Sequence, residues 1–336
     1  MFIRHFSQIS KKDVLIAGGK GASLGEMTKA GLPVPPGFVV LAGAFDRFIS
    51  ETEIGADIEA ILKKVNHKDI NSVEAASKKI RSIITGQIIP KDIAAEISVN
   101  FKKLGAKFVA VRSSATAEDS KIASWAGELE TYLNVTDKQV LKYVQTCWSS
   151  LFTPRAIFYA FEKGFYRRKQ PSPSSFAKAT ADRRPSPRGR GGLGVAVAVV
   201  IQKMVQSEVS GIAFTVHPVT KDYNQLVIEA GLGLGEAIVG GLVTPDNYVV
   251  HKKELSILDI SISEQSMMIV RSPKGNKQQK LSTAVGGKQK LTGKQIIELA
   301  KICVGIEKHY KKPQDIEWAF EKNRFYITQS RPITTL

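Results

Sequence analysis

Two runs of alternating apolar and polar residues, separated by a short polar segment, lie near the carboxyl end of the chain. Their sequences are QDIEWAF (residues 314–320) and FYITQSRP (residues 325–332). Alternation with a period of two is typical of β-strands, and two such runs so close together indicate an antiparallel hairpin. Ile316 and Trp318 then share an apolar face, and Glu317 lies on the opposite face. The end of the chain is therefore expected to form part of an antiparallel sheet with one polar face.

The register of this hairpin decides which polar side chains meet. A loop with an odd number of residues, centred on Asn323, pairs Glu317 with Gln329. The same register pairs Asp315 with Arg331. Carboxylate and amide oxygens suit Mg²⁺, so Glu317 and Gln329 are candidate metal ligands. A loop with an even number of residues would separate the pair, and a solvent-facing polar stripe is the structural alternative.

Lys20 lies in the glycine-rich stretch GGKGASLG (residues 18–25), which we expect to form a turn that opens an amphipathic helix over 23–30. Glycines let backbone N–H groups approach a phosphate, and a helix N-terminus favours an anion. The spacing is not that of a Walker P-loop. A plain turn at the start of a helix is the alternative interpretation.

Arg112 follows a short buried strand, FVAV (residues 108–111), and precedes a run of hydroxyl residues. A guanidinium at the end of a strand suits a two-pronged contact with phosphate. The alternative is structural, with Arg112 paired to Glu118 or Asp119 in a capped turn. The segment alone does not decide between these two interpretations.

Three other positions are weaker candidates. Glu229 begins EAGLGLGE (residues 229–236), which is either a nucleotide-facing turn or a place of close strand–helix packing. Gln202 follows a long apolar strand, where its amide is placed to contact an adenine edge. His217 precedes a proline, and a structural role in a turn is favoured over phosphorylation. No histidine has metal-ligand spacing, and no Ser-His-Asp or Cys-His arrangement is evident.

Length and composition predict a globular protein with one large or two medium domains. The 336 residues are 43% hydrophobic and 24% charged. Residues 169–192 differ from the rest because they are rich in Pro, Ser, Arg and Gly, which predicts a disordered insertion. We expect one lobe over residues 1–168 and a second lobe over residues 193–336.

Of the net charge of +17, +7 lies between Arg167 and Arg190, where eight basic residues accompany one acidic residue, and the rest is spread along the chain. A nucleic-acid-binding tail is disfavoured there because the basic residues are not interleaved with aromatic ones. The two cysteines form no CxxC pattern and indicate a reducing compartment. No apolar run matches a signal peptide or could span a bilayer, so we expect a cytoplasmic protein without membrane contact.

Taken in order along the chain, these segments resemble the N-terminal domain of phosphoenolpyruvate synthases. The matching segments are GGKGASLGEM, LPVPPGFVV, FVAVRSSATAEDS, AGELETYLNV, VIQKMVQSEVSGIAFTVHPVT, IEAGLGLGEAIVGGLVTPDNYVV, IVRSPKG and QDIEWAF with FYITQSRP. Pyruvate phosphate dikinases and rifampin phosphotransferases share a looser version. The resemblance covers nearly the whole chain except residues 169–192. It implies an α+β fold of the ATP-grasp type, in which two lobes clamp ATP.

The resemblance also implies roles for individual residues and an overall reaction. Lys20, Arg112 and Thr131 would lie at the phosphates, Gln202 would face the adenine, and Glu229 would also contact the nucleotide. Glu317 and Gln329 would hold Mg²⁺, while Asp315 and Arg331 would act with Arg112 at the transferring phosphoryl group. The reaction implied is ATP, pyruvate and water to phosphoenolpyruvate, AMP and phosphate, with positioning and electrostatics as the main sources of catalysis.

Three departures from the family pattern bear on this expectation. Glu128 stands where the synthases usually have Gln, and His217 replaces the usual Asp of FTVDP. The acceptor histidine of a TSHAA-type motif and the pyruvate-binding barrel do not occur in these 336 residues. We therefore expect the phosphohistidine and pyruvate-binding domains on a separate polypeptide. A non-catalytic or truncated nucleotide-binding module and the ATP-binding domain of a rifampin-type phosphotransferase are the alternatives.

Overall fold

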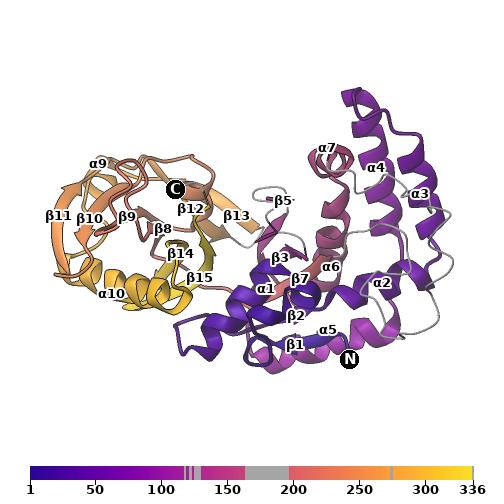
Figure 1. Cartoon of the computed structure of the whole chain (residues 1–336), viewed down its shortest axis with the longest axis horizontal. Coiled ribbons are helices and arrows are strands. Elements are labelled where there is room, and N and C mark those ends of the chain that lie inside the picture. The colour runs from indigo at the N-terminus through magenta and orange to yellow at the C-terminus, as the bar shows by residue number, and fades with distance from the viewer. Residues whose placement is uncertain (117–118, 121–122, 125–129, 163–196, 273–274, 335–336) are drawn as a thin grey trace, which may run out of the picture.

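The computed structural model describes residues 1–116, 119–120, 123–124, 130–162, 197–272 and 275–334. Its larger strands form two sheets, one in each of two lobes that lie along the long axis of the molecule (Figure 1). Both sheets are antiparallel, and helices pack against each of them. The described part of the chain therefore has the α+β architecture expected from the sequence.

The first lobe carries most of the helices. Its elements are β1 (Ile3–His5), α1 (Val14–Lys29), β2 (Gly37–Val40), α2 (Ala42–Glu51), α3 (Gly55–Lys63), α4 (Ile70–Gly86), α5 (Lys91–Leu104), β3 (Val109–Ala115), β4 (Asp119–Ser120), β5 (Ala123–Ser124), β6 (Thr131–Val135), α6 (Val140–Ser149), α7 (Pro154–Glu162) and β7 (Val197–Lys203). The sheet order is β1-β2-β7-β3-β6, and β4 pairs with β5 separately.

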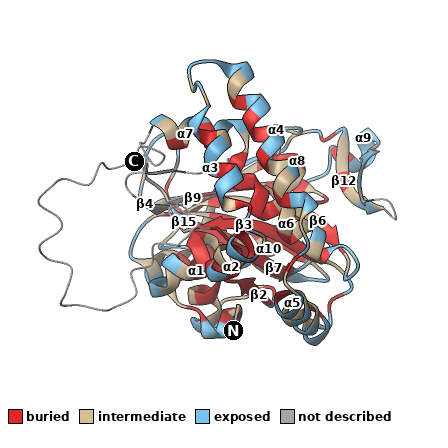
Figure 2. Cartoon of the chain, turned by 90° about the vertical axis from the view of Figure 1, so that its right-hand side faces the viewer, coloured by how far each residue is buried: buried red, intermediate tan, exposed pale blue. Residues whose placement is uncertain are grey.

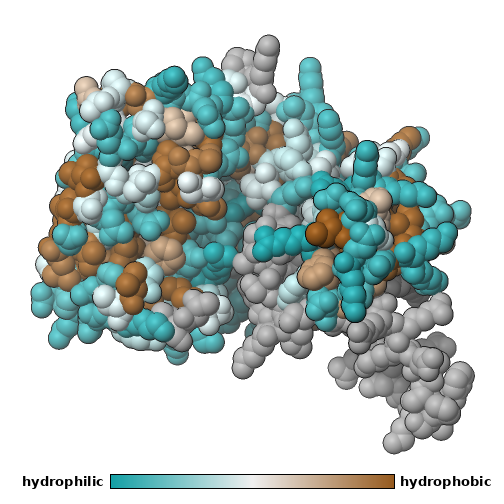
Figure 3. Space-filling view, turned by 90° about the horizontal axis from the view of Figure 1, so that it is seen from above, coloured by the Kyte–Doolittle hydropathy of each residue, from teal (hydrophilic) through white to brown (hydrophobic). Residues whose placement is uncertain are grey.

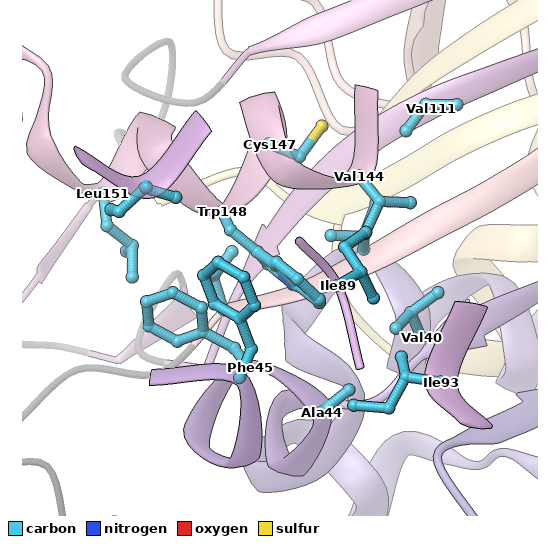
Figure 4. Close-up of a cluster of buried hydrophobic side chains, with 14 of the residues drawn as sticks. Val40, Ala44, Phe45, Ile89, Ile93, Val111, Val144, Cys147, Trp148 and Leu151 are labelled. Carbon is cyan, nitrogen blue, oxygen red and sulfur yellow. The ribbon is translucent and has the colours of Figure 1, made fainter. Parts of the chain in front are cut away.

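One face of the first sheet packs against helices α2 to α7 and forms a large apolar core. Figure 2 shows this arrangement, with buried strands beneath helices whose outer faces are exposed. Trp148 on α6 is fully buried, and its ring lies 5.9 Å from that of Phe45 and 5.0 Å from that of Phe48 on α2 (Figure 4). Residues 51–104 supply helices α3, α4 and α5 to this layer.

The second lobe is built on a larger sheet. Its elements are β8 (Val209–Phe214), β9 (Gln225–Leu232), α8 (Glu236–Val239), β10 (Asp246–His251), β11 (Ser256–Ser261), β12 (Met267–Ser272), β13 (Gly275–Lys280), α9 (Thr283–Gly286), α10 (Gly293–Tyr310), β14 (Gln314–Glu321) and β15 (Arg324–Pro332). The sheet order is β11-β10-β9-β8-β14-β15, and β12 pairs with β13 separately.

Helix α10 covers one face of the second sheet. Its apolar residues recur at helical spacing and point at the sheet, because they include the buried Ile296, Leu299, Ala300, Cys303 and Ile306. Thr292 caps its N-terminus by accepting a hydrogen bond from the backbone N–H of Gln295. Figure 3 shows the molecule from above, where apolar residues gather over the second lobe and the first lobe is mainly hydrophilic.

Helix α1 joins the two lobes. Leu24 and Met27 on its inner side belong to the same apolar cluster as Val200 on β7 and Trp318 on β14. The Ser23 hydroxyl donates to the carbonyl of Ser330 on β15 at 2.7 Å. The second face of the first sheet therefore packs, through α1, against the second lobe.

Strand β7 shows that order in the sequence does not decide sheet membership. It lies just after residue 193, where the second lobe is expected to begin, yet it pairs with β2 and β3 in the middle of the first sheet. Strand β8 is the first strand of the second sheet. The division into lobes stays a prediction, but the backbone pairing of residues 197–203 lies wholly in the first sheet.

None of the helices in the described part of the chain combines the length and the apolar character needed to cross a membrane. The two cysteines are buried and unpaired.

Candidate functional site

Strands β14 and β15 form the hairpin expected from the sequence, but its loop is different. Glu321 pairs with Arg324, so the loop contains the two residues Lys322 and Asn323. Both have positive φ, 52° and 56°, as a two-residue type I′ turn requires. The prediction of an odd-numbered loop centred on Asn323 is wrong, because the strands extend closer to the turn than expected.

A β-bulge restores the expected register. Trp318 pairs with Ile327 and Glu317 pairs with Gln329, so Thr328 is the additional residue on β15. Beyond the bulge, Asp315 pairs with Arg331. The pairing of the candidate metal ligands is thus confirmed, although a bulge and a two-residue loop produce it together.

Arg112 crosses from β3 of the first sheet to this hairpin of the second. Its Nη1 donates to the carbonyl of Thr328 at 2.9 Å. Its Nη2 donates to Gln329 Oε1 at 2.7 Å and to Glu317 Oε2 at 3.1 Å. Arg112 and Gln329 are 7% and 9% exposed, so the polar face is covered at this point rather than being a solvent-facing stripe. The structural alternative for Arg112 involved Glu118 and the Asp119 side chain, which lie outside the described residues.

Lys20 lies on α1 where that helix touches β3. The expected glycine-rich turn is instead part of α1, which is kinked at Gly18 with φ 70° and ψ 171°. The hydroxyl of Ser114 explains the arrangement, since it donates to the Ala17 carbonyl at 2.9 Å and accepts from the Gly21 N–H at 3.2 Å. Lys20 is therefore held on the helical turn that begins at the kink, beside the strand that carries Arg112.

The other two candidates of the first lobe lie on the same face of its sheet as Arg112. Thr131 is the cross-strand partner of Arg112 and is exposed. Gln202 lies on β7 opposite Ala110, one side-chain row from Arg112. It is 2% exposed, and its amide donates to the Pro35 carbonyl at a long 3.5 Å. The fold therefore gathers Arg112, Thr131 and Gln202 on one face of the first sheet.

Three carboxylates share the polar face of the second sheet. Ile212 pairs with Glu317 on one side and with Glu229 on the other, so both carboxylates point to the same face. Asp315 lies two residues from Glu317 and pairs with Arg331, whose Nε lies 2.8 Å from Asp315 Oδ2. This face, with α1 and Arg112 beside it, is the candidate site.

The electrostatics of these carboxylates follow from burial. Burial raises the pKa of Asp315 above its ordinary value; Arg331 opposes this rise and the negative charge of Glu317 adds to it. Burial also raises the pKa of Glu229, and the charge of Asp315 contributes to the same shift. The site therefore concentrates negative charge on one sheet and the cation Arg112 opposite it.

Glu130 is a residue that the sequence analysis did not single out. It precedes Thr131, and its carboxylate accepts from Arg81 Nη2 on α4 at 2.6 Å and from the hydroxyl of Tyr132 at 2.5 Å. Its carbonyl accepts from the N–H and the hydroxyl of Ser113, beside Arg112. The sequence did offer one signal for Glu130. It is the second carboxylate in Gly127-Glu-Leu-Glu130, directly before Thr131, which the family resemblance places at the phosphates.

Of the two positions that depart from the family pattern, the structure describes His217 but not Glu128. Glu128 lies outside the described residues, as does the insertion at 169–192. His217 lies in the turn after β8, where its Nδ1 accepts from the backbone N–H groups of Val219 and Thr220 at 3.3 and 3.2 Å. These contacts agree with the structural role that the sequence favoured.

The donor set fits a hard cation. Glu317 Oε2 and Gln329 Oε1 converge on one positively charged atom, Arg112 Nη2, so both oxygens already point toward a common point occupied by a cation. Among the described residues, no group of three or more His, Cys, Asp and Glu side chains is arranged to hold a metal. Two protein oxygens are compatible with Mg²⁺, which keeps water and phosphate as its other ligands.

Comparison with known proteins places this arrangement in a family. Residues 14–336 match the pyruvate phosphate dikinase AMP/ATP-binding domain, which has an ATP-grasp-type fold. The whole chain is 47% identical to a probable phosphoenolpyruvate synthase of Methanocaldococcus jannaschii, covering 27% of that protein. It is 40% identical to the phosphoenolpyruvate synthase of Pyrococcus furiosus, covering 44% of it.

A rifampicin phosphotransferase of Bacillus subtilis is 37% identical over 98% of the chain, which covers 35% of that relative. The chain thus spans less than half the length of each of these three proteins. The match of residues 14–336 and the similarity to phosphoenolpyruvate synthases confirm the resemblance seen in the sequence motifs. The chain belongs to the family of pyruvate phosphate dikinase AMP/ATP-binding domains.

Proposed function

We propose that this chain binds Mg·ATP between its two sheets and donates a phosphoryl group to a histidine carried outside these 336 residues. The observation that carries the proposal is the convergence of Glu317 Oε2 and Gln329 Oε1 on Arg112 across the two lobes. A carboxylate, an amide oxygen and a guanidinium meet there on the face that also carries Asp315 and Arg331. The family match to an AMP/ATP-binding domain supports ATP as the ligand.

The proposed roles follow the two sheets. From the first lobe, Lys20, Arg112 and Thr131 bind phosphate oxygens, and Gln202 faces the adenine. From the second lobe, Glu317 and Gln329 hold the cation, and Glu229 lies along the nucleotide. Arg331, oriented by Asp315 at 2.8 Å, contacts the phosphoryl group being transferred.

The bound cation would supply neutralisation of the charge that develops on the phosphoryl group. The protein's own part is positioning: Arg112 and Lys20 present donors from one side, and the hairpin presents acceptors from the other. Burial of Gln202 and Arg112 keeps their donors oriented and water excluded. These residues thus account for donation of a phosphoryl group, and acceptance requires a nucleophile from elsewhere.

The similarity to phosphoenolpyruvate synthases favours a histidine that passes the group on to pyruvate. The similarity to a rifampicin phosphotransferase supports a second candidate, in which the same donor half serves a different final acceptor. We further propose that the chain works in the cytoplasm, which two buried and unpaired thiols support.

The test is transfer of label. The chain is mixed with Mg²⁺, ATP labelled in its β- and γ-phosphates, and the separately purified histidine domain of a phosphoenolpyruvate synthase. We expect acid-labile label on that domain, its loss with Glu317→Ala, and its retention with Glu254→Ala, a control carboxylate that is 70% exposed. Binding of ATP without any transfer of label to the histidine domain would contradict the proposal.

A further inference from the structure

Among the described residues, the side-chain hydrogen bonds of Arg112 all reach the other lobe. They reach the carbonyl of Thr328 at 2.9 Å, Gln329 Oε1 at 2.7 Å and Glu317 Oε2 at 3.1 Å. The side chain is almost fully buried, and one contact is an ion pair. The guanidinium therefore ties β3 of the first sheet to the β14–β15 hairpin of the second.

The two oxygens that hold Nη2 are the same two that the proposed function assigns to the cation. Mg²⁺ binds oxygen ligands at about 2.0–2.1 Å, which is shorter than either nitrogen–oxygen distance. A cation placed between these two oxygens would take the position of Arg112 Nη2. Two positive charges at one partly desolvated point also repel each other strongly.

We infer that Arg112 and the divalent cation compete for Glu317 and Gln329, so that cation binding releases the guanidinium toward the phosphates. The inference rests on the proposed function, since it needs Glu317 and Gln329 to be the cation ligands. Arg112 then serves two partners in turn. It ties the lobes through the metal ligands first and binds phosphate once the cation has displaced it.

Two further observations support this exchange. The Nε of Arg112 is buried and has no hydrogen-bond partner among the described residues, so the guanidinium holds a donor that its present position leaves unused. Thr131, the cross-strand partner of Arg112, is exposed, so an acceptor of phosphate character can reach this row of the first sheet. Displacement from the hairpin would let both Nε and the terminal nitrogens donate to phosphate oxygens.

The lobes need not separate when Arg112 moves. The Ser23 hydroxyl on α1 still donates to the Ser330 carbonyl at 2.7 Å, and His309 Nε2 on α10 lies 3.0 Å from Glu26 Oε1 on α1. The apolar cluster shared by α1, β7 and β14 also continues across the junction. The exchange is therefore a local movement of one side chain at the edge of a fixed contact.

The test measures binding of Mn²⁺ alone, without nucleotide, by calorimetry and by the loss of the free-ion electron paramagnetic resonance signal. Arg112→Met removes the competing charge, so we expect Mn²⁺ to bind on the order of tenfold more tightly than to the unaltered chain. Arg112→Lys keeps a charge without the planar fork and should lie between the two. Arg324→Met, an exposed arginine on the same hairpin, is the matched control and should leave Mn²⁺ affinity unchanged.

The same variants are then titrated with ATP in the presence of saturating Mn²⁺. Arg112→Met should bind ATP more weakly while binding Mn²⁺ more tightly, a pair of opposite changes that a purely structural arginine would not give. Equal or weaker Mn²⁺ binding by Arg112→Met and Arg112→Lys, with the unaltered chain still binding Mn²⁺ through Glu317, would overturn the exchange alone. Failure of every form to bind Mn²⁺, with or without ATP, would instead overturn the cation site of the proposed function.

Discussion

Replacing Gly18 by alanine would add one methyl group at the point where α1 meets β3. A Cβ at this position would lie 2.2 Å from Ser114 Oγ and 2.3 Å from the Ser114 carbonyl oxygen. The carbonyl belongs to the backbone of a buried strand, so a change of side-chain rotamer cannot relieve the contact. The backbone at Gly18, with φ 70° and ψ 171°, is in a region that essentially only glycine adopts.

Two costs then add. Holding a residue other than glycine in this conformation costs about 1–3 kcal/mol. Overpacking a well-filled contact costs about 1–3 kcal/mol more. We therefore expect Gly18→Ala to lower the free energy of unfolding by about 2–6 kcal/mol. ATP affinity should also fall, because the displaced turn carries Lys20.

The assay is urea denaturation followed by circular dichroism, with Gly305→Ala as the matched control. Gly305 lies within α10, is exposed, and has no heavy atom near the position of an added Cβ. Alanine there should raise the free energy of unfolding by about 0.5–1 kcal/mol. Stability of Gly18→Ala within about 0.5 kcal/mol of the unaltered chain would refute the reasoning from close contact and backbone conformation.

Three further predictions concern charged groups. Lys290 and Asp246 form an ion pair at 2.8 Å with both side chains 0% exposed; Lys290→Met should cost about 3–5 kcal/mol in urea denaturation, and adding Asp246→Asn should recover part of it. The raised pKa of Glu229 means that the folded form binds its proton more tightly, so ionisation costs stability above that pKa. Glu229→Gln should therefore be more stable than the unaltered chain at neutral pH, and the difference should shrink as the pH falls through the folded pKa toward the ordinary value of 4.5. Arg81→Met should weaken ATP binding by about twofold to fivefold in calorimetry, with partial rescue by Arg81→Lys, because Arg81 anchors Glu130 at 2.6 Å. Unchanged ATP affinity in Arg81→Met would remove Glu130 from the site.

The β14–β15 hairpin shows what alternation in a sequence can predict. The faces of Ile316 and Glu317 follow from the two-residue period alone, and the structure has them as expected. The two-residue turn could not be predicted from the sequence, because Lys322 is not a residue type that favours positive φ. Only its place in the closed hairpin holds Lys322 in that conformation. The bulge at Thr328 was equally hidden, since no residue type specifies one.

The sequence also did not identify the contacts between residues that lie far apart along the chain. For Arg112 the sequence offered neighbours within seven residues, whereas its observed partners lie more than 200 positions away. Strand β7 looked like the start of the second lobe because it follows the insertion, yet backbone hydrogen bonds to β2 and β3 determine its place. The family resemblance assigned Arg112, Glu317 and Gln329 to one nucleotide site, but only the folded structure shows which of their atoms are in contact.

We propose above all that Glu317 and Gln329 make ATP binding depend on Mg²⁺. Calorimetric titration of the chain with ATP, with and without Mg²⁺, tests it most directly, with Glu317→Ala and Lys20→Ala as variants and Glu254→Ala as the control. We predict tight binding only with Mg²⁺, a loss of about tenfold or more in Glu317→Ala, equivalent to about 1.4 kcal/mol, and unchanged affinity in Glu254→Ala. Equal affinity of the unaltered chain and Glu317→Ala for ATP in the presence of Mg²⁺ would contradict the account.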